Sequence, residues 1–336
     1  MKKIDFEAHF LTSEFVAALY ANKGYPRFAD EKEGRRLWHN SGIVQPFADG
    51  LLVPLMDLGE KRIREMDRCG VEVQLVSLAA PGVEGLDPVT GCEIARRAND
   101  TLFEVMKRCS GRIMGYAALA VRNPVVAADE LERTVTELGF KGWNTHSNYG
   151  DTMLDDPAYR PILHRAEKLG VPVYLHPAVP AGAEMKGYGF ALAGAPFGFG
   201  VDAALCVFRL IYSGIFDQCP GLKLILGHLG EALPFLFKRI DWAWVRPFDP
   251  KARPRLEKKP SEYLRGNVYV TTSGNYYEPA FKCTYEAMGK ERILLGTDYP
   301  FEDMEESIRF VDGLPLSSED RERIYGRNAE ALGITL

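Results

Sequence analysis

IDFEAH, residues 4–9, is a short apolar, β-rich run that ends on a carboxylate and an imidazole, Glu7 and His9. Three later apolar runs also end in an imidazole or a carboxylate: VPVYLH at His176, KLILGH at His228 and ILLGTD at Asp298. Such polar groups are costly beside apolar segments unless something compensates them, and a bound cation does so well. If the runs are parallel barrel strands, their C-terminal ends converge on one mouth, where barrel enzymes keep their chemistry. The run ends therefore predict one functional site.

The apolar pattern alternates between strand-like and helix-like periods along the whole chain. Eight strand-like runs lie at 3–8, 72–78, 113–120, 139–145, 171–176, 222–227, 267–272 and 292–297. Helix-like stretches separate them, among them 91–108, 125–138, 156–169, 202–217, 230–241 and 277–289. Eight alternating units predict an α/β fold with a closed (β/α)8 TIM barrel. An open doubly wound sheet is the alternative, but no GxGxxG follows the first strand, which weakens its dinucleotide-binding version.

Three segments are longer than an ordinary connection between a strand and a helix. They cover about 10–58, 177–200 and 241–264. Long loops at a barrel mouth usually shape a substrate pocket or an oligomer interface, and surface decoration is the alternative. No internal repeat and no convincing domain boundary interrupts the pattern. We therefore expect residues 1–336 to form a single barrel domain with these three excursions.

The bulk properties exclude several classes of partner. The formal net charge of −5 gives no reason to expect nucleic acid or an anionic membrane. The six cysteines form no CxxC pair and no dense framework, which is typical of thiols in a reducing cytoplasm. The N-terminus enters a strand pattern directly, and no apolar run is long enough to span a bilayer. We expect a cytoplasmic protein that binds neither nucleic acid nor membrane.

The residue types at the run ends suit a metal. Glu7 and His9 are two apart on a strand, so both side chains leave the same face and can contact one ion. A lone His176 is more often a hydrogen-bonded core histidine, and Asp298 could instead cap a helix that begins near Glu302. Taken together, two carboxylates and two imidazoles favour ligation of Zn²⁺ or Mn²⁺, and the absence of thiolates argues against a structural zinc finger.

One ion is a better prediction than two. Lys141 lies early in its strand rather than at its end, so a carbamylated lysine bridging two metals is not expected. The first strand also has ExH rather than the HxH of binuclear sites. His146, which ends the fourth strand, is expected to line the pocket without ligating.

A second His–Glu pair lies beside this set. His228 ends the sixth run, and Glu231 follows three residues later in GHLGE. A hydrogen bond from such a Glu can hold the His in one tautomer, so that it acts as acid, base or anion-stabilising group. Alternatively, the negative charge of Glu231 interacts favourably with the positive N-terminal end of a helix dipole. This role is compatible with a hydrogen bond to His228.

The sequence resembles the amidohydrolase superfamily, specifically its branch of non-oxidative aromatic acid decarboxylases. That branch includes γ-resorcylate, 2,3-dihydroxybenzoate and 5-carboxyvanillate decarboxylases and, more distantly, aminocarboxymuconate semialdehyde decarboxylase. The matching segments run nearly end to end and include FEAHF, RRANDTL, ELGFKGWNTHS, VPVYLHPA, GLKLILGHLGEALPF, VYVTTSGN, LLGTDYPFE and GRNAEAL. Where these relatives commonly have EEH, this chain has EAH, and the altered residue is the outward-facing one.

The resemblance implies a barrel of the metal-dependent hydrolase type and assigns roles to the residues. It implies that the metal ligands are Glu7, His9, His176 and Asp298. It places His228 beside the substrate with Glu231 supporting it. It also implies that Arg239 reaches a substrate carboxylate, in a neighbouring subunit's site, and that Phe301 contacts the aromatic ring.

These residues suit a metal-dependent decarboxylase of an ortho-hydroxy aromatic acid, such as a dihydroxybenzoate. We expect Asp298 to protonate the ring carbon that bears the carboxylate, with His228 and Glu231 stabilising the anion or relaying a proton. A lactone or ester hydrolase that uses a metal-activated water, with Asp298 as base, is the alternative. A non-catalytic binding scaffold is a third. The excursion at 241–264 and Arg239 suggest a homodimer or homotetramer.

Overall fold

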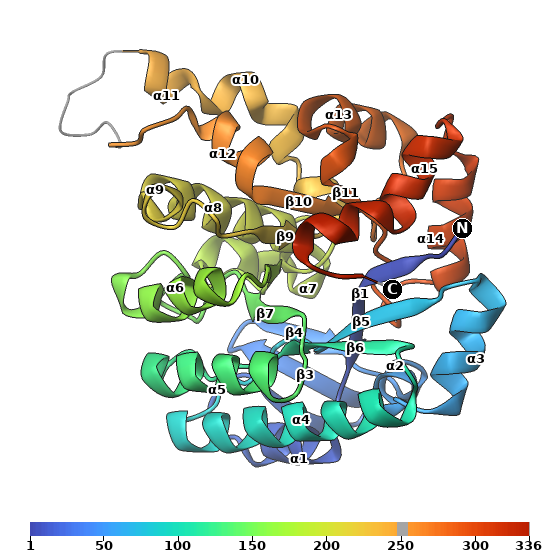
Figure 1. Cartoon of the computed structure of the whole chain (residues 1–336). Helices are drawn as coiled ribbons and strands as arrows, with labels where there is room; N and C mark the ends of the chain where they lie inside the picture. Colours follow the sequence, from blue (N-terminus) through green and yellow to red (C-terminus); the bar gives the residue numbers. More distant parts are fainter. Residues whose placement is uncertain (247–254, 336) are drawn as a thin grey trace.

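The computed structural model describes residues 1–246 and 255–335. Eight parallel strands form one sheet in the order β1-β5-β6-β7-β8-β9-β10-β11 (Figure 1). They span Ile4–Phe10, Val73–Leu78, Ile113–Ala117, Gly142–His146, Val173–His176, Leu224–Leu226, Val268–Thr271 and Ile293–Leu294. The sheet closes on itself because the Phe6 amide of β1 donates to the carbonyl of Leu295, just after β11. The predicted (β/α)8 barrel is confirmed.

Helices connect the strands and cover the outside of the barrel (Figure 1). The α-helices of this layer are α3 (Glu60–Cys69), α4 (Pro88–Arg108), α5 (Pro124–Thr136), α6 (Arg160–Leu169), α8 (Gly198–Tyr212), α9 (Ile215–Gln218), α12 (Pro260–Asn267), α13 (Glu278–Met288), α14 (Met304–Gly313) and α15 (Ser318–Tyr325). Short 3₁₀ turns accompany them at η1 (Pro157–Tyr159), η5 (Lys290–Arg292) and η6 (Arg327–Leu332). Within the described part of the chain, none of the helices combines the length and apolarity needed to cross a membrane.

The longest helix, α4, illustrates why these stretches are helical. Asp87 caps it by accepting hydrogen bonds from the amides of Val89 and Thr90. Its buried positions recur with helical spacing, as in Ala98, Leu102 and Val105, so one face packs against the barrel.

Apolar side chains fill the barrel in two layers. An inner cluster contains Phe6, Tyr116, Tyr174 and Tyr269, which come from different strands and pack inside the barrel. A much larger cluster lies between the strands and the surrounding helices. Since side chains alternate between the two faces of a regular strand, the inner cluster identifies which residues point inward; in β1 a register shift between Asp5 and Ala8 breaks this alternation, so that Glu7 and His9 reach the barrel mouth although Phe6 also points inward.

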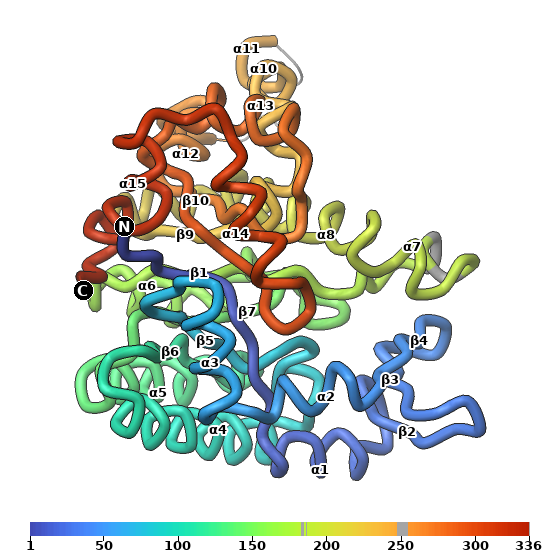
Figure 2. The backbone as a smooth tube through the Cα atoms, turned by 90° about the vertical axis from the view of Figure 1, so that its right-hand side faces the viewer, coloured from blue at the N-terminus to red at the C-terminus, as the bar shows by residue number. Residues whose placement is uncertain are grey.

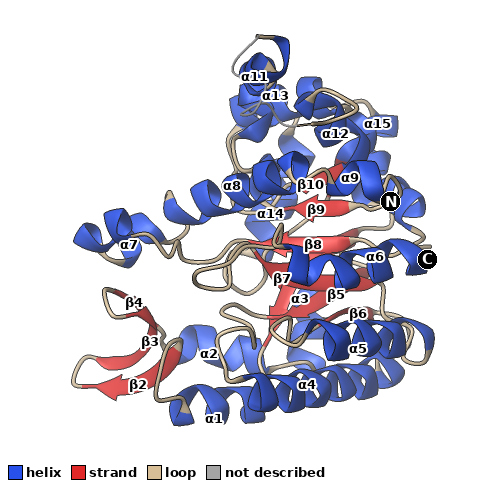
Figure 3. Cartoon of the chain, turned by 90° about the vertical axis from the view of Figure 1, so that its left-hand side faces the viewer, coloured by secondary structure: helices blue, strands red, loops and turns tan. Residues whose placement is uncertain are grey.

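Two of the predicted excursions pack together beyond the barrel. The excursion at 10–58 holds α1 (Ser13–Ala21), β2 (Arg27–Glu31), β3 (Gly34–Asn40), β4 (Ile43–Pro46) and α2 (Asp49–Met56), with the three strands in an antiparallel sheet. The excursion at 177–200 holds η2 (Ala183–Tyr188) and α7 (Phe190–Ala193). Ile43 packs with Val179 and Ala193, and the ring of His39 stacks on that of Phe190. Both excursions lie at the end of the barrel opposite the chain termini (Figures 2 and 3).

The prediction of one helix over 230–241 is wrong. This stretch is broken into η3 (His228–Gly230), η4 (Leu233–Leu236) and α10 (Phe237–Ile240). Leu229, Glu231 and Ala232 have φ values of 59°, 51° and 62°, a left-handed conformation that a continuous α-helix excludes. The third excursion, 241–264, lies partly outside the described residues, and its described part contains α11 (Trp242–Val245) and the start of α12.

Candidate active site

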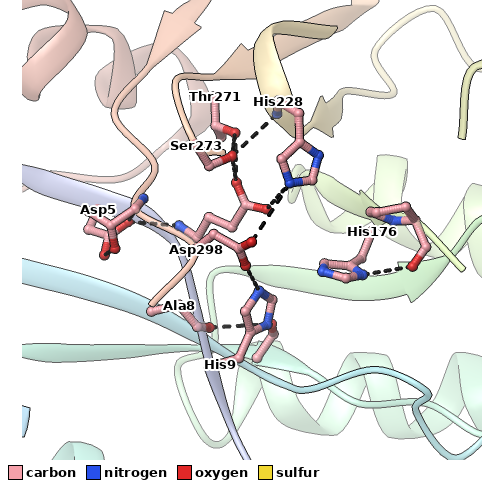
Figure 4. Close-up of polar contacts among 12 residues, drawn as sticks. Asp5, Ala8, His9, His176, His228, Thr271, Ser273 and Asp298 are labelled. Carbon is pink, nitrogen blue, oxygen red and sulfur yellow. Dashed lines mark hydrogen bonds and ion pairs between the residues drawn. The ribbon is translucent and has the colours of Figure 1, made fainter. Parts of the chain in front are cut away.

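The four predicted ligand residues meet at the C-terminal mouth of the barrel (Figure 4). Glu7 and His9 come from β1, His176 is the last residue of β8, and Asp298 follows β11. One possible ligand atom from each lies within 4.8 Å of the other three. All four residues are buried, with at most 8% of their surface exposed. Side chains from the first, fifth and eighth barrel strands are therefore brought to one point.

Neighbouring groups orient both residues of β1. His9 Nδ1 lies 3.0 Å from the hydroxyl of Ser77 on β5, which turns Nε2 toward Asp298 Oδ1, 2.9 Å away. Thr271 donates a 2.7 Å hydrogen bond to Glu7 Oε2, and the hydroxyl of Ser273 donates to the same oxygen. These bonds use one oxygen of Glu7 and leave the other directed to the site.

The backbone fixes His176 and Asp298. His176 Nδ1 donates to the carbonyl of Pro177 at 2.8 Å, so the other ring nitrogen, Nε2, keeps its lone pair for a ligand. Asp298 has a left-handed φ of 55°. The alternative role of Asp298 as a helix cap is not seen, because Asp303 caps α14 by accepting from the Glu306 amide.

The donor set fits a divalent cation. Three buried atoms make no regular hydrogen bond among the residues that the structure describes: Glu7 Oε1, and the pair His9 Nε2 and Asp298 Oδ1, which have only their 2.9 Å ionic contact with each other. Buried polar atoms normally have a partner, and a cation would satisfy all three at once. Two carboxylates and two imidazoles without a thiolate suit Zn²⁺ or Mn²⁺.

The protonation states agree with this role. Burial lowers the pKa of His176 well below its ordinary value, and the nearby His9 and His146 lower it further, so its imidazole is neutral. Burial raises the pKa of Asp298, but His228 and His9 together outweigh burial and hold that pKa well below its ordinary value. A neutral imidazole and an ionised carboxylate are the forms that bind metals.

His228 faces the cluster from η3, just beyond β9. Its Nδ1 lies 2.6 Å from Glu231 Oε1, and its Nε2 lies 3.7 Å from Glu7 Oε1 and 3.8 Å from Asp298 Oδ2. Burial lowers the pKa of His228, but Glu231, Glu7 and Asp298 outweigh burial and raise it well above its ordinary value. The predicted pairing of His228 with Glu231 is present. Glu231 itself is in a left-handed turn rather than at the start of an α-helix, so its dipole role does not apply.

The two predicted substrate contacts are in different places. The ring of Phe301 lies 5.5 Å from that of His9, at the edge of the cluster. Arg239 is exposed on α10, where its guanidinium stacks over the ring of Trp242 at 5.6 Å. Phe301 thus lies at the site of its own chain, whereas Arg239 lies on the outer surface.

The sequence analysis assigned no role to the hydroxyl groups that hold the ligands. Ser77, Thr271 and Ser273 lie at or just beyond the ends of β5 and β10. Polar residues in EVQLVSL and VYVTTSGN, at the ends of runs that are otherwise apolar, are the signal that could have identified them.

Known proteins resemble the whole chain. The amidohydrolase family model matches residues 4–332. The γ-resorcylate decarboxylase of Polaromonas sp. is 38% identical, and the match covers 98% of both chains. The structure of a dihydroxybenzoic acid decarboxylase from Polaromonas sp. JS666, with bound manganese and the inhibitor 2-nitroresorcinol, has a TM-score of 0.84 at 34% identity and covers 98% of this chain and 96% of that chain. The 5-carboxyvanillate decarboxylase of Sphingomonas paucimobilis has a TM-score of 0.89 at 32% identity and covers 99% of both chains.

These matches confirm the resemblance that the motifs indicated. They extend from β1 to η6 and include every strand that contributes to the cluster. The chain therefore belongs to the amidohydrolase family, with aromatic acid decarboxylases among its relatives.

Proposed function

We propose that the protein is a metal-dependent, non-oxidative decarboxylase of an ortho-hydroxy aromatic carboxylic acid. The observation that carries this proposal is the buried cluster of Glu7, His9, His176 and Asp298 at the barrel mouth. The relatives support the reaction type, because those with 38% and 32% identity are both named as decarboxylases of hydroxylated aromatic acids.

The ortho-hydroxyl explains how the carboxylate can leave. Direct loss of CO₂ from an aromatic ring would leave its electron pair on an unstabilised aryl carbon. An ortho-phenolate instead pushes electrons into the ring, so that the carbon bearing the carboxylate can accept a proton. The bond to the carboxylate then breaks, its electron pair returns to the ring, and CO₂ leaves as aromaticity is restored. No electrons are gained or lost overall, so no redox cofactor is needed.

Asp298 is the proposed proton donor to this ring carbon. Because the Asp298 carboxylate is ionised in the free site, it must first receive the proton from charged His228, whose Nε2 lies 3.8 Å from Asp298 Oδ2, and then pass it to the ring carbon. Glu231 holds the other nitrogen of His228, so that Nε2 stays directed at the cluster. Positive charge on His228 also stabilises the anionic substrate and its phenolate.

One divalent ion, Zn²⁺ or Mn²⁺, is proposed to occupy the cluster. When bound, such a cation supplies positive charge that orients and stabilises the carboxylate and phenolate oxygens of the substrate. Manganese in the related dihydroxybenzoic acid decarboxylase supports Mn²⁺. Metal analysis of the purified protein, followed by removal and separate reconstitution with each ion, tests which one supports turnover.

Phe301 is the proposed contact for the substrate ring, because it lies beside His9 at the edge of the cluster. Arg239 is proposed to reach a substrate carboxylate in the site of a neighbouring subunit. Its exposed position on α10 supports a role at an interface.

A homodimer or homotetramer is proposed on the same grounds. Val201, Leu205 and Tyr212 are exposed apolar residues that recur along α8 with helical spacing, so they form one apolar face. Phe235, in η4 just before α10, has 80% of its surface exposed. A second copy that covers these residues would bring Arg239 to an interface. Light scattering that finds only monomer would contradict this proposal.

The chain is also proposed to work in the cytoplasm, as one domain. All six cysteines are free thiols, as a reducing compartment favours. The family match from residue 4 to 332 supports a single domain.

The hydrolase alternative is distinguished by its products. The relatives named above favour decarboxylation over hydrolysis of a lactone or ester. We would incubate one metal-loaded preparation with a panel of ortho-hydroxybenzoates and, in parallel, with aryl esters and lactones. CO₂ release from at least one acid, without comparable ester or lactone hydrolysis, is expected. Hydrolysis without CO₂ release would overturn the proposal.

A further inference from the structure

Arg62, in the first turn of α3, is a charged side chain that the fold buries completely. Its exposed fraction is 0%, although it lies in the helix layer outside the barrel rather than among the metal-ligating candidates. Burial lowers its pKa to about 10, so the guanidinium keeps its charge at neutral pH. A buried charge is costly unless hydrogen bonds compensate it, and the partners of Arg62 therefore indicate why it is placed there.

Two of these partners belong to the segments that carry the ligand candidates. Arg62 Nη2 donates a 2.6 Å hydrogen bond to the carbonyl oxygen of His9. The guanidinium carbon lies 5.0 Å from the centre of the ring of Tyr299, the residue after Asp298. The backbone joins the same two positions, because the His9 amide donates to the Tyr299 carbonyl at 2.8 Å. Arg62 therefore contacts one ligand candidate directly and another through its neighbour in the chain.

The strand β1 is irregular at this place. Its pairing with β5 shifts register between Asp5 and Ala8, so the regular ladder does not by itself fix the backbone. Side-chain contacts supplement it: Gln74 of β5 donates from Nε2 to Asp5 Oδ2 at 2.9 Å, and its Oε1 accepts from Arg62 Nη1 at 3.3 Å. The amide and the hydroxyl of Thr297 also donate to Asp5, at 2.9 and 2.6 Å. Arg62 thus belongs to a buried polar network at the seam where the barrel closes.

The remaining partners of the guanidinium belong to the excursion at 10–58. Arg62 Nε donates to the carbonyl of Asp57 at 2.8 Å, and Nη2 lies 3.4 Å from the carbonyl of Pro54. Both carbonyls are at the C-terminal end of α2, where the last carbonyls of a helix lack their regular partners. One side chain therefore joins the last helix of the excursion to the strand β1.

We propose that Arg62 is a positioning residue, which sets the direction from which His9 and Asp298 approach the bound cation. It contacts neither the substrate nor the metal, and it acts through the His9 carbonyl and the Tyr299 ring. This inference rests on the metal site of the proposed function but not on the reaction. Lysine cannot take over this role, because it presents one point charge where Arg62 has a planar fork with partners on several sides.

Metal binding by folded variants tests this directly. Co²⁺-loaded wild type, Arg62→Lys and Arg62→Met would be compared by visible absorption, because the d–d bands of Co²⁺ depend on the geometry of its ligands. The Kd for Mn²⁺ would be measured on the same proteins by electron paramagnetic resonance. We expect both variants to shift the Co²⁺ bands and to bind Mn²⁺ about ten- to a hundredfold more weakly, with Arg62→Lys the less affected.

Arg112→Met is the matched control. Arg112 also donates to backbone carbonyls, those of Glu72 and Val71, but at the opposite end of β5 from the ligand candidates. Loss of either arginine should lower the melting temperature, whereas only the Arg62 variants should change the Co²⁺ spectrum. The spectrum therefore separates positioning of the ligands from general stabilisation of the barrel.

The outcomes also separate this inference from the proposed function. An unchanged Co²⁺ spectrum and Mn²⁺ Kd in either folded Arg62 variant overturn the inference, as does an equal change in Arg112→Met. If neither Arg62 variant folds, Gln74→Met, which removes the link between Arg62 and Asp5, takes their place, and an unchanged spectrum in that variant overturns the inference. Failure of wild type to bind either ion overturns the metal site and this inference with it. Wild type that binds Mn²⁺ but releases no CO₂ from the panel of acids overturns the proposed reaction alone.

Discussion

Asp298 brings its carboxylate to the site from a backbone conformation that residues other than glycine rarely adopt. Its φ is 55°, and His228 and Glu231 have φ values of 53° and 51°. A left-handed backbone costs such residues on the order of 1–2 kcal/mol each. Three left-handed residues at one barrel mouth indicate that surrounding contacts hold them in this backbone conformation against their intrinsic preference for negative φ values. The positions of the side chains, as well as their chemical types, therefore define the site.

His176→Ala is expected to remove the metal while leaving the barrel folded. One of four ligand groups is lost, and affinity should fall by at least about a hundredfold, because even residues that only support a ligand contribute about ten- to a hundredfold. Elemental analysis after dialysis measures the metal content, and circular dichroism measures folding. His164→Ala, on the exposed face of α6, is the control and should retain metal. A stoichiometric metal content in His176→Ala would contradict the ligand assignment.

Glu231→Gln is expected to reduce kcat by about ten- to a hundredfold with the metal retained. The 2.6 Å contact between Glu231 and His228 Nδ1 holds the ring and favours its charged form, and an amide cannot supply that charge. Steady-state kinetics and metal analysis on the same sample measure the two effects. An unchanged kcat would show that Glu231 does not act through His228.

At the residue scale, the sequence allowed prediction of the charged and imidazole groups but not of the groups that orient them. Glu7 and His9 are rare residue types at the end of an apolar run, so they stand out. Ser77 and Thr271 are ordinary residues in strands, and only the packing of neighbouring strands shows that they contact His9 and Glu7. A hydroxyl obtains its role from its tertiary neighbours, which a single sequence does not display.

At the scale of elements, strands and regular helices were predictable to within a few residues, whereas the excursions were not. The helix α13 covers Glu278–Met288, close to the predicted 277–289. The stretch 230–241 has helical periodicity, but the left-handed residues Gly230, Glu231 and Ala232 interrupt it, and of these only Gly230 is a residue type that signals a break. The small sheet β2-β3-β4 carries many charged residues, which hide the alternation that identifies strands.

His39 makes the stability of this excursion sensitive to acid. Burial lowers its pKa from 6.5 to about 4, although a hydrogen bond with Gln45 partly opposes this. The folded state therefore keeps His39 neutral, while the unfolded chain takes up a proton below pH 6.5. The free energy of unfolding is therefore unaffected by His39 above pH 6.5. It decreases as pH falls toward 4, by no more than about 3 kcal/mol.

Thermal unfolding at pH 7.5 and pH 5 measures this effect. Wild type should lose more stability than His39→Gln over this interval, because the variant has no titrating group at that position. His164→Gln, which changes an exposed histidine, should follow wild type. Identical pH dependence in wild type and His39→Gln would contradict this prediction.

At the scale of the whole molecule, the barrel follows from the count and order of the apolar runs. Eight βα units at regular intervals fit a closed parallel barrel, and closure between β1 and Leu295 brings the two ends of the chain together. Closure is also what places Asp298 beside His9. Assembly into oligomers could not be derived in this way, because one sequence shows an apolar surface only after the fold is known.

Mixing of subunits tests whether Arg239 acts in a neighbouring site. His176→Ala and Arg239→Ala should each be nearly inactive as pure proteins. A mixed dimer contains one site with intact metal ligands and with Arg239 supplied by the other subunit. Random co-assembly is therefore expected to restore about a quarter of wild-type activity. A mixture no more active than its components would show that Arg239 does not act between subunits.

The central claim is that the cluster at the barrel mouth decarboxylates an ortho-hydroxy aromatic acid by protonating its ring. The most direct measurement is incubation of Mn²⁺-loaded protein with 2,6-dihydroxybenzoate in D₂O, with CO₂ and the ring product quantified together. We predict equal amounts of CO₂ and resorcinol, with deuterium at the carbon that bore the carboxylate, and no CO₂ from 3,5-dihydroxybenzoate, which lacks an ortho-hydroxyl. Absence of CO₂ release from every ortho-hydroxy acid by protein with bound metal, or equal release from 3,5-dihydroxybenzoate, would contradict the claim.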